Sequence, residues 1–276
     1  MNQPRHLPGF LPTVLTACRQ TLRAHLQWRL GLWVGLFAAI LFGVAALLAE
    51  RAHESLDGRS LFLLLSWWIG GTVMVPWGTM YLGVQAVHGP LEDRTYLYEF
   101  LRPVPRSALL LGKWLGVSLL AAGGAALLAG GLFAGAATNP DRWGDGLEWD
   151  LLGTIVVLFL LAALAYAAVA AWFSALFRRP LAWGTFFVVG LQMLTANLPV
   201  SAGLRQLTIT DPLRRFVLDA VNPDQRLARG LWPAERAFQS DLVGEPIQDL
   251  VVLTAVCLLL AVWWYTRTEF DARNRE

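Results

Sequence analysis

The sequence predicts an all-α integral membrane protein with six transmembrane helices, formed as a single transmembrane domain by residues 1–276. The chain is 56% hydrophobic and only 15% charged, and its mean hydropathy is +0.49. Soluble domains usually carry about 25% charged residues. The apolar residues are also collected into long runs without charge. The net charge of +2 is too small to indicate a nucleic-acid partner.

Six charge-free apolar runs mark the expected spans, and a helix needs roughly 20 residues to cross the hydrocarbon core. The runs cover residues 30–49, 61–87, 114–138, 151–177, 181–204 and 250–266. The second and fourth runs, of 27 residues each, must tilt, kink or extend beyond the bilayer. Pro76 predicts a kink in the second.

Residues 1–29 precede the first span and predict an interfacial helix. Apolar residues recur there at spacings of three or four, at Leu11, Leu15, Cys18, Leu22 and Leu26. Arg19 and Arg23 lie on a different side of the same helix. Such a helix fits the inner headgroup layer, and a simple anchoring role is the favoured interpretation.

The third span is rich in small residues. Between positions 121 and 137, 13 of 17 residues are Ala or Gly, including Gly131 and Gly135 at a spacing of four. Small residues let membrane helices approach closely and pack through backbone contact. We therefore expect this span to lie at the centre of a tight bundle.

Residues 205–249 form the one sizeable segment outside the spans, and we expect a small external helical segment. Asp211-Pro212 is typical of a helix start, with the acid capping and Pro in the first turn. Asn222-Pro223 should end that helix. Pro233 should open another, and Pro246 precedes the last span.

Basic residues in the short loops predict that both termini are cytoplasmic. The short outer loops would then hold only Arg51, Arg59 and Arg142. The cytoplasmic side would hold Arg5, Arg19, Arg23, Arg29, Arg94, Arg102, Arg106, Lys113, Arg178, Arg179, Arg267, Arg273 and Arg275. The expected location is the cell (inner) membrane, with multiple passes.

The chain has no recognisable nucleotide-binding loop of its own. Gly112-Lys113 is followed by Trp rather than Ser or Thr, and position 107 is Ser rather than Gly, so a phosphate-binding loop is excluded. Charges are absent from the middle of all six runs, which argues against a carrier that couples its own energy source. Uncharged polar residues do occur there: Gln85, Gln192, Thr195 and Asn197. They could line a pathway or form hydrogen bonds between helices.

A metal or acid/base cluster could include His88, Glu92 and Asp93. His88 and Glu92 would share a helix face at a spacing of four. However, Gly89-Pro90 predicts the start of a fresh helix, which would break that register. Carboxylates in its first turn would then favour the positive end of the helix dipole.

A charged connection, residues 88–107, lies between the second and third spans. Residues 90–101 are long enough for about three helical turns, and Arg102 precedes Pro103, which disfavours continuing the helix. A short amphipathic helix held on the cytoplasmic side by two spans suits docking on a soluble partner. The alternative is that it lies on the membrane surface.

This connection resembles the membrane subunit of type-2 ABC transporters. The similar residues are Glu92-Asp93-Arg94-Thr95-Tyr96, Leu101-Arg102-Pro103-Val104-Pro105-Arg106 and Leu111-Gly112-Lys113. The family pattern is an acidic pair, a small residue before Thr-Leu, then Leu-Pro-Val-Ser-Arg and Gly-Lys. Arg94 replaces the small residue here, and Pro105 replaces Ser. The six spans, interfacial helix and large fifth loop resemble the family more loosely.

The resemblance implies a permease subunit, most consistent with an exporter, that forms its pathway as a homodimer or heterodimer. Its connection would be a coupling helix docked on a separate ATP-binding subunit, through Glu92, Asp93, Arg94, Thr95, Tyr96, Glu99, Arg102, Pro103, Pro105 and Arg106. ATP and Mg would be bound by that partner, so this chain would need no cofactor and would not be an enzyme. The second and fifth spans would face the pathway.

An alternative function is an integral-membrane enzyme or assembly factor acting through His88, Glu92 and Asp93. The substrate cannot be inferred from the sequence: polysaccharide, lipid, peptide, drug and metal-maturation cargo all remain open.

Overall fold

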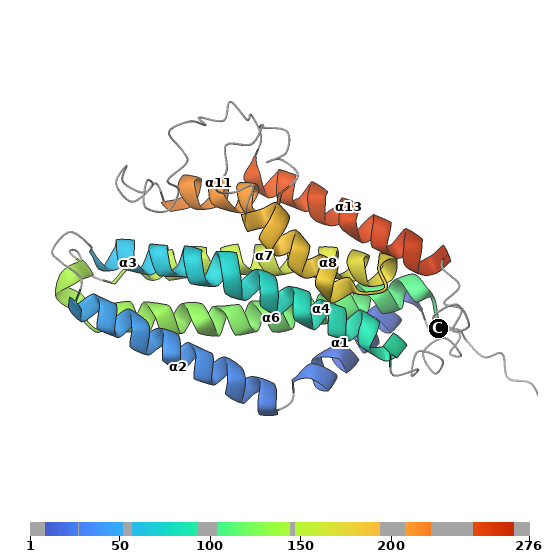
Figure 1. Cartoon of the computed structure of the whole chain (residues 1–276), viewed down its shortest axis with the longest axis horizontal. Coiled ribbons are helices and arrows are strands. Elements are labelled where there is room, and N and C mark those ends of the chain that lie inside the picture. Colours follow the sequence, from blue (N-terminus) through green and yellow to red (C-terminus); the bar gives the residue numbers. More distant parts are fainter. Residues whose placement is uncertain are drawn as a thin grey trace, which may run out of the picture.

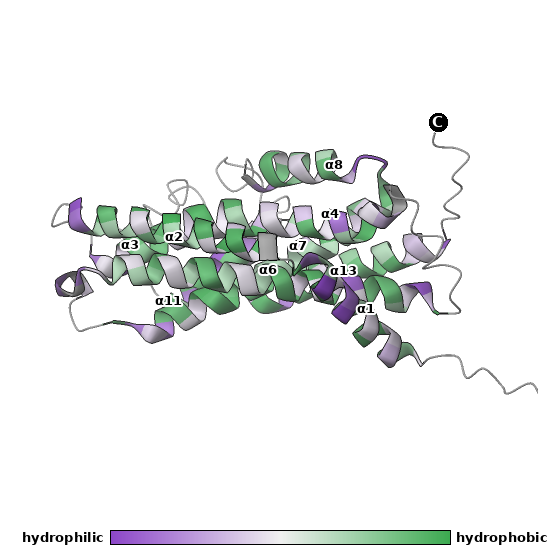
Figure 2. Ribbon diagram, turned by 90° about the horizontal axis from the view of Figure 1, so that it is seen from below, coloured by the Kyte–Doolittle hydropathy of each residue, from purple (hydrophilic) through white to green (hydrophobic). Residues whose placement is uncertain are grey.

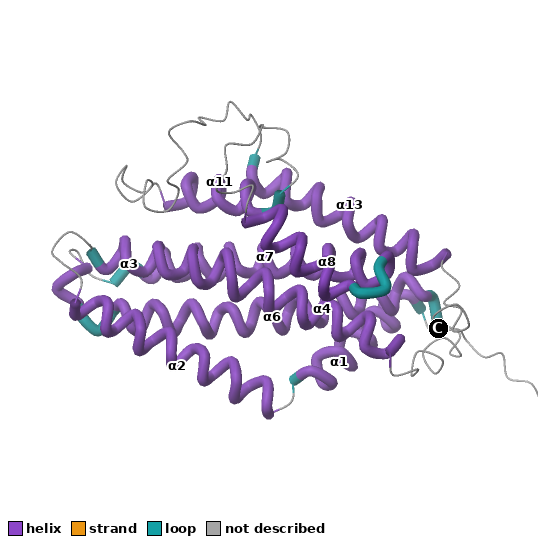
Figure 3. Tube along the Cα trace, viewed as in Figure 1, coloured by secondary structure: helices purple, strands orange, loops and turns teal. Residues whose placement is uncertain are grey.

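The computed structural model describes residues 9–26, 28–51, 57–92, 104–143, 147–193, 208–221 and 245–267. Regular structure within these residues is entirely helical, as the sequence predicts (Figure 3). The elements in order are α1 (Phe10–His25), α2 (Trp28–Arg51), α3 (Gly58–Leu65), η1 (Ser66–Met74), α4 (Val75–Glu92), α6 (Arg106–Ala136), η2 (Pro140–Trp143), α7 (Trp149–Leu176), α8 (Pro180–Phe186), η3 (Phe187–Met193), α11 (Thr210–Val221) and α13 (Pro246–Arg267).

Five helices are long and apolar enough to cross a membrane. They are Leu30–Arg51, Gly58–Pro90, Arg106–Ala136, Trp149–Leu176 and Pro246–Arg267. These correspond to the first, second, third, fourth and sixth expected spans. The fifth is represented by the shorter apolar helix Pro180–Gln192, and residues 194–207 lie outside the described part of the chain. The six-span layout as a whole therefore stays a prediction.

The long helices run side by side along the molecule, with α7 at the centre (Figure 1). Helix α7 is the most buried of the five and packs against α4, α6 and α13, whereas α2 and α13 are the least buried. Apolar side chains stay exposed along α2, including Trp33, Leu36 and Ile40. Hydrophobic residues cover the length of the bundle in Figure 2. Because water cannot solvate such surfaces favourably, they suit a lipid environment.

The two ends of the bundle are named here by one residue each. The Arg51 end contains the end of α2, the start of α3, η2 and the start of α7. The Arg106 end contains the end of α4, the start of α6, the turn between α7 and α8, and the end of α13 (Figure 1). The connection 93–103, outside the described residues, thus joins two helix termini at the Arg106 end.

The second span has a wide turn just before its proline. Residues Ser66–Met74 form a π-helix, and the Val75 N–H bonds to the Gly70 carbonyl five residues back. A proline lacks an N–H and its ring crowds the carbonyl four residues earlier. The wider turn relieves that crowding ahead of Pro76. The feature the sequence suggested as a kink is therefore a π-helical segment.

Helix α6 packs against α1 and α2 with almost no side chain in between. A Cβ added at Gly131 would lie 2.7 Å from the Ala38 carbonyl oxygen of α2, and one at Gly135 would collide with the Phe42 carbonyl oxygen. This confirms the close packing predicted from the Gly131/Gly135 spacing. The expected central place of this span was wrong, because α7 is more buried than α6. Backbone contact of this kind requires small residues such as glycine at the interface.

The same helix holds α1 through a second glycine pair. A Cβ at Gly112 would lie 2.5 Å from the Val14 carbonyl oxygen, and one at Gly116 would lie 3.0 Å from the Cys18 carbonyl oxygen. The opposite side of α1 carries the exposed side chain of Leu15. Helix α1 is thus packed closely on α6 through one face, and its opposite face is exposed and includes an apolar side chain. An interfacial position in the membrane stays a prediction.

Within the expected external segment, the structure describes residues 208–221 and 245–249. Helix α11 starts at Thr210, next to the predicted start at Asp211-Pro212, and ends at Val221 before Asn222-Pro223, as predicted. Helix α13 begins at Pro246 and so includes residues that were expected to precede the last span. The cap differs: the Thr208 hydroxyl accepts the Asp211 N–H at 3.3 Å, and Asp211 lies within the first turn. Pro233 lies outside the described residues.

Candidate functional site

The Arg106 end carries the first candidate site, and the structure describes only its borders. Pro105 is exposed and extended (φ −66°, ψ 125°) directly before α6, which begins with the exposed Arg106. Helix α4 ends at Glu92, whose side chain is not described. The remaining predicted docking residues lie outside the described part of the chain: Asp93, Arg94, Thr95, Tyr96, Glu99, Arg102 and Pro103.

Helix α4 does not restart at Gly89-Pro90, which corrects the sequence prediction. It continues through Pro90 to Glu92. Proline costs one backbone hydrogen bond in a helix, and one lost bond is tolerated where neighbouring helices and side chains surround the turn. His88 and Glu92 therefore keep the register of one helix face.

His88 is buried at 4% exposure. Among the described residues, no group of three or more His, Cys, Asp or Glu side chains is placed to hold a metal ion.

Two pockets flank the last turns of α4, and Gln85 lines both. One pocket, of about 160 Å³, lies between α1, α4 and α6, where its polar lining includes Gln20, His25 and Lys113. The other, of about 270 Å³, lies between α4 and the turn that joins α7 to α8. Gln85 is itself exposed, so this predicted pathway residue lies where a bound molecule could reach it.

Gln192, the second predicted pathway residue, has a clear hydrogen-bonding role. Its side chain is 3% exposed. Its Oε1 accepts the N–H groups of Ile209 and Thr210 at 3.0 and 3.1 Å and the Thr210 hydroxyl at 2.8 Å. Tyr166 of α7 adds a side-chain hydrogen bond to Thr210. The buried amide thus joins η3 to the start of α11. Thr195 and Asn197 lie outside the described residues.

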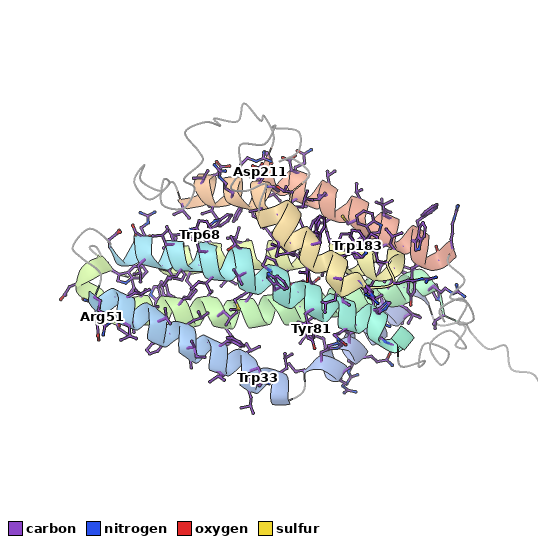
Figure 4. The ribbon with its side chains drawn as sticks, viewed as in Figure 1. Trp33, Arg51, Trp68, Tyr81, Trp183 and Asp211 are labelled. Carbon is purple, nitrogen blue, oxygen red and sulfur yellow. The ribbon has the colours of Figure 1, made fainter. Side chains whose placement is uncertain are left out.

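Helix α11 is also fixed to two other spans by charged groups. Arg215 pairs with Asp249 of α13 at 2.6 Å and with Asp211 at 3.1 Å. At the far end of α11, Arg59 of α3 donates to the Val221 carbonyl at 2.9 Å. These contacts hold α11 against the bundle (Figure 4, Asp211), so α11 is linked to α3, α7 and α13.

Sequence reasoning missed three of these features. Lys113, the single lysine, was noted as part of a motif and as one of the basic residues of the loops, yet it is buried at 7% exposure and lines a pocket. Tyr166 and Thr210 were not singled out. The Gly112/Gly116 spacing was a usable signal, whereas no local pattern links Gln192 to Thr210.

Comparison with known proteins gives one match to a protein family. The family model described as "ABC-2 family transporter protein" matches residues 34–269, which is most of the chain. A comparison with curated proteins finds no match.

Proposed function

Because this chain belongs to the ABC-2 family of transporter proteins, we propose that it forms the translocation pathway of an ABC exporter and couples to a separate ATP-binding subunit through residues 88–107. It is a multi-pass membrane protein and a permease, the transport component rather than an ATPase. Within this proposal, ATP and Mg are bound by the partner chain. Two membrane subunits, identical or different, pair around the pathway.

One observation carries the docking proposal. The described borders of the connection, Glu92 at the end of α4 and Pro105 before α6, belong to helices that pack side by side and open at the same end of the bundle (Figure 1). Both ends of this segment are held by packed helices. A bound partner that displaces the segment would therefore also displace the second and third spans. Rigid transmission of this kind is what coupling to an ATPase requires.

The docking test reverses charge within the connection. Truncating a residue at the centre of an interface can cost about 2 kcal/mol or more, whereas a solvated rim charge costs little. Glu92→Lys with Glu99→Lys should therefore release the ATP-binding subunit, measured by co-purification and by ATP hydrolysis in reconstituted membranes. Pro103→Ala with Pro105→Ala should leave the subunit bound but poorly coupled to transport, since it loosens the connection without removing a contact.

A matched control exists at the Arg51 end. Glu50 and Asp150 are exposed there, and reversing both to Lys makes the same change of net charge away from the connection. Both measurements should match those of the unaltered protein. If the Glu92/Glu99 reversal behaves like this control, the connection is a surface helix and the docking proposal fails.

For the pathway, we propose that the second and fifth spans line it and that α8 moves relative to α4. Each of these spans includes a π-helical segment, η1 or η3, and such segments are frequent at functional sites. The exposed Gln85 amide between two pockets adds support. Gln85→Leu should change substrate-stimulated ATP hydrolysis and leave assembly intact.

The proposed orientation puts the Arg106 end and both termini in the cytoplasm, following the bias of basic residues. A reporter fused after Glu276 should be cytoplasmic, and one inserted near Asp145 should be external. Finding the two reporters on the same side of the membrane would contradict both the orientation and the six-span layout.

A further inference from the structure

The larger pocket at the Arg106 end has a lining of mixed polarity. Its volume is about 270 Å³, and it lies between the last turns of α4 and the turn from α7 into α8. The polar and basic residues of the lining are Gln85 and His88 from α4 and Arg178 and Arg179 from the turn. The apolar residues include Val84 from α4 and Leu181 and Ala182 from the start of α8. A molecule that fills this pocket would need an anionic or polar part next to an apolar part.

The charge of the pocket is positive. Arg178 and Arg179 are permanently charged and exposed to the surroundings, and His88 of α4 lines the same pocket. Among the described residues that line the pocket, none is Asp or Glu. A guanidinium group presents paired N–H donors that match the oxygens of a phosphate. The basic residues of the lining therefore favour a phosphate or a similar oxyanion.

Aromatic residues indicate that the pocket lies at the level of the lipid headgroups. Trp183, on the first turns of α8, stacks on Phe177 with ring centroids 4.7 Å apart, and about half of its surface is exposed (Figure 4). At the same end of the bundle, the Arg267 guanidinium lies 4.8 Å from the Trp263 ring centre. Tryptophan prefers the boundary between hydrocarbon and headgroups.

The hydropathy of α8 and of the turn before it also fits a position at the level of the lipid headgroups. The turn is hydrophilic, whereas α8 itself is largely hydrophobic (Figure 2). Leu181 and Phe186 of α8 are exposed and offer an apolar surface that continues from the pocket. An acyl chain could follow this surface while its headgroup stays with the two arginines.

We propose that this pocket binds the headgroup phosphate of an anionic phospholipid from the surrounding bilayer. Pockets for whole small molecules usually measure about 300–1,000 Å³, so this one suits a headgroup rather than a bulky transported molecule. The two arginines hold the phosphate, and the exposed face of α8 contacts the acyl chains. Lipid bound here would touch both α4 and α8. The proposal requires a bilayer but no ATP-binding subunit, so it stands or falls separately from the proposed function.

The test measures lipid retention by the full-length chain purified in detergent. Phosphatidylglycerol and phosphatidylcholine are offered separately, and bound lipid is counted by native mass spectrometry. We expect phosphatidylglycerol to be retained in preference. Arg178→Gln with Arg179→Gln should weaken its retention roughly tenfold, because two charge-assisted contacts are lost. Arg178→Lys with Arg179→Lys should keep the preference, since the charge remains.

Two controls distinguish lipid binding in this pocket from a general attraction of anionic lipid to basic residues. Arg19 and Arg23 on α1 are exposed and outside this pocket, so replacing both with Gln removes the same charge and should leave retention unchanged. Inorganic phosphate at excess should not displace the lipid. The proposal would be overturned if the Arg19/Arg23 and Arg178/Arg179 double variants lost bound phosphatidylglycerol to the same extent. Displacement of the lipid by inorganic phosphate would also overturn it, because it would indicate a site for free anions.

Discussion

Helix α6 meets α1 and α2 backbone to backbone, whereas α8 meets α4 through a flexible side chain and beside a pocket. A Cβ added at Gly131 would collide with a carbonyl oxygen of α2, but one added at Gly184 of α8 would lie 2.5 Å from the terminal methyl of Met80. A backbone cannot yield to such a contact, while a methionine side chain can rotate away. The first interface therefore fixes two helices in one arrangement, and the second permits adjustment.

This difference divides the bundle into a rigid part and an adjustable part. The rigid part contains α1, α2 and α6, joined through Gly112, Gly116, Gly131 and Gly135. Helix α4 also packs closely on α7, because a Cβ at Gly83 would lie 2.5 Å from the short Ala170 side chain. In α8, the single glycine, Gly184, faces the end of a flexible side chain, and the aromatic side chains Trp183 and Phe186 remain exposed.

The largest expected effect comes from overfilling the rigid interface. Gly131→Val adds a branched side chain whose Cβ would lie 2.7 Å from the Ala38 carbonyl oxygen. Overpacking of this kind lowers the free energy of unfolding by about 1–3 kcal/mol or more. We expect loss of folded protein, measured by thermal unfolding in detergent and by yield. The neighbouring Gly130→Val is the control, because a Cβ there meets nothing within 4 Å. Equal stability of the two variants would remove the distinction between the two interfaces.

A smaller loss of stability is expected from Gln192→Leu. The amide oxygen would no longer accept the N–H groups of Ile209 and Thr210, and a buried donor left without a partner costs about 1–3 kcal/mol. The melting temperature should fall, and α11 should become accessible to protease before the spans do. Gln85→Leu, at an exposed position, should leave the melting temperature unchanged. If Gln192→Leu instead alters only substrate-stimulated ATP hydrolysis, its main role is in the pathway.

The smallest expected effect is that of Arg215→Gln. This change removes the ion pairs with Asp211 and Asp249. The Asp249 side chain is 42% exposed, so solvent screens that pair. The Arg215 and Asp211 side chains are only 14% and 10% exposed, but Gln can still donate a hydrogen bond, which limits the expected cost to about 1–2 kcal/mol. The difference in stability between this variant and the unaltered protein should be smaller in high salt. Salt screens the ion pairs that the unaltered protein still has. A cost that is large and independent of salt would mean that the side chain acts mainly through packing.

Local patterns in the sequence predicted the individual helices and one of the close contacts of the rigid part. Charge-free runs located five long helices, the Gly131/Gly135 spacing identified the backbone contact, and Asn222-Pro223 marked the end of α11. These features depend on composition and periodicity along one segment. A membrane helix satisfies its backbone within itself, so such segments can be recognised one at a time.

Contacts between segments that are far apart in the sequence could not be predicted from such local patterns. The pocket brings Gln85 next to Arg178 and Arg179, and no pattern in either segment points to the other. Pro90 was interpreted by its local preference as a helix start, but packing overrode that preference and α4 continued. Pro76 gave a local signal for the π-helical segment η1, whereas we found no comparable signal in the sequence for η3.

The measurement that tests the central claim most directly is a pair of distances between spin labels, taken in the reconstituted complex with and without ATP. One pair joins Tyr81→Cys on α4 to Phe186→Cys on α8, and the other joins Leu36→Cys on α2 to Leu127→Cys on α6. All four native side chains are exposed. Both native cysteines are buried, and burial raises the pKa of the Cys18 thiol, which disfavours its labelling.

The account predicts that ATP changes the distance between α4 and α8 and leaves the distance between α2 and α6 constant. A constant α4–α8 distance together with a changing α2–α6 distance would contradict it.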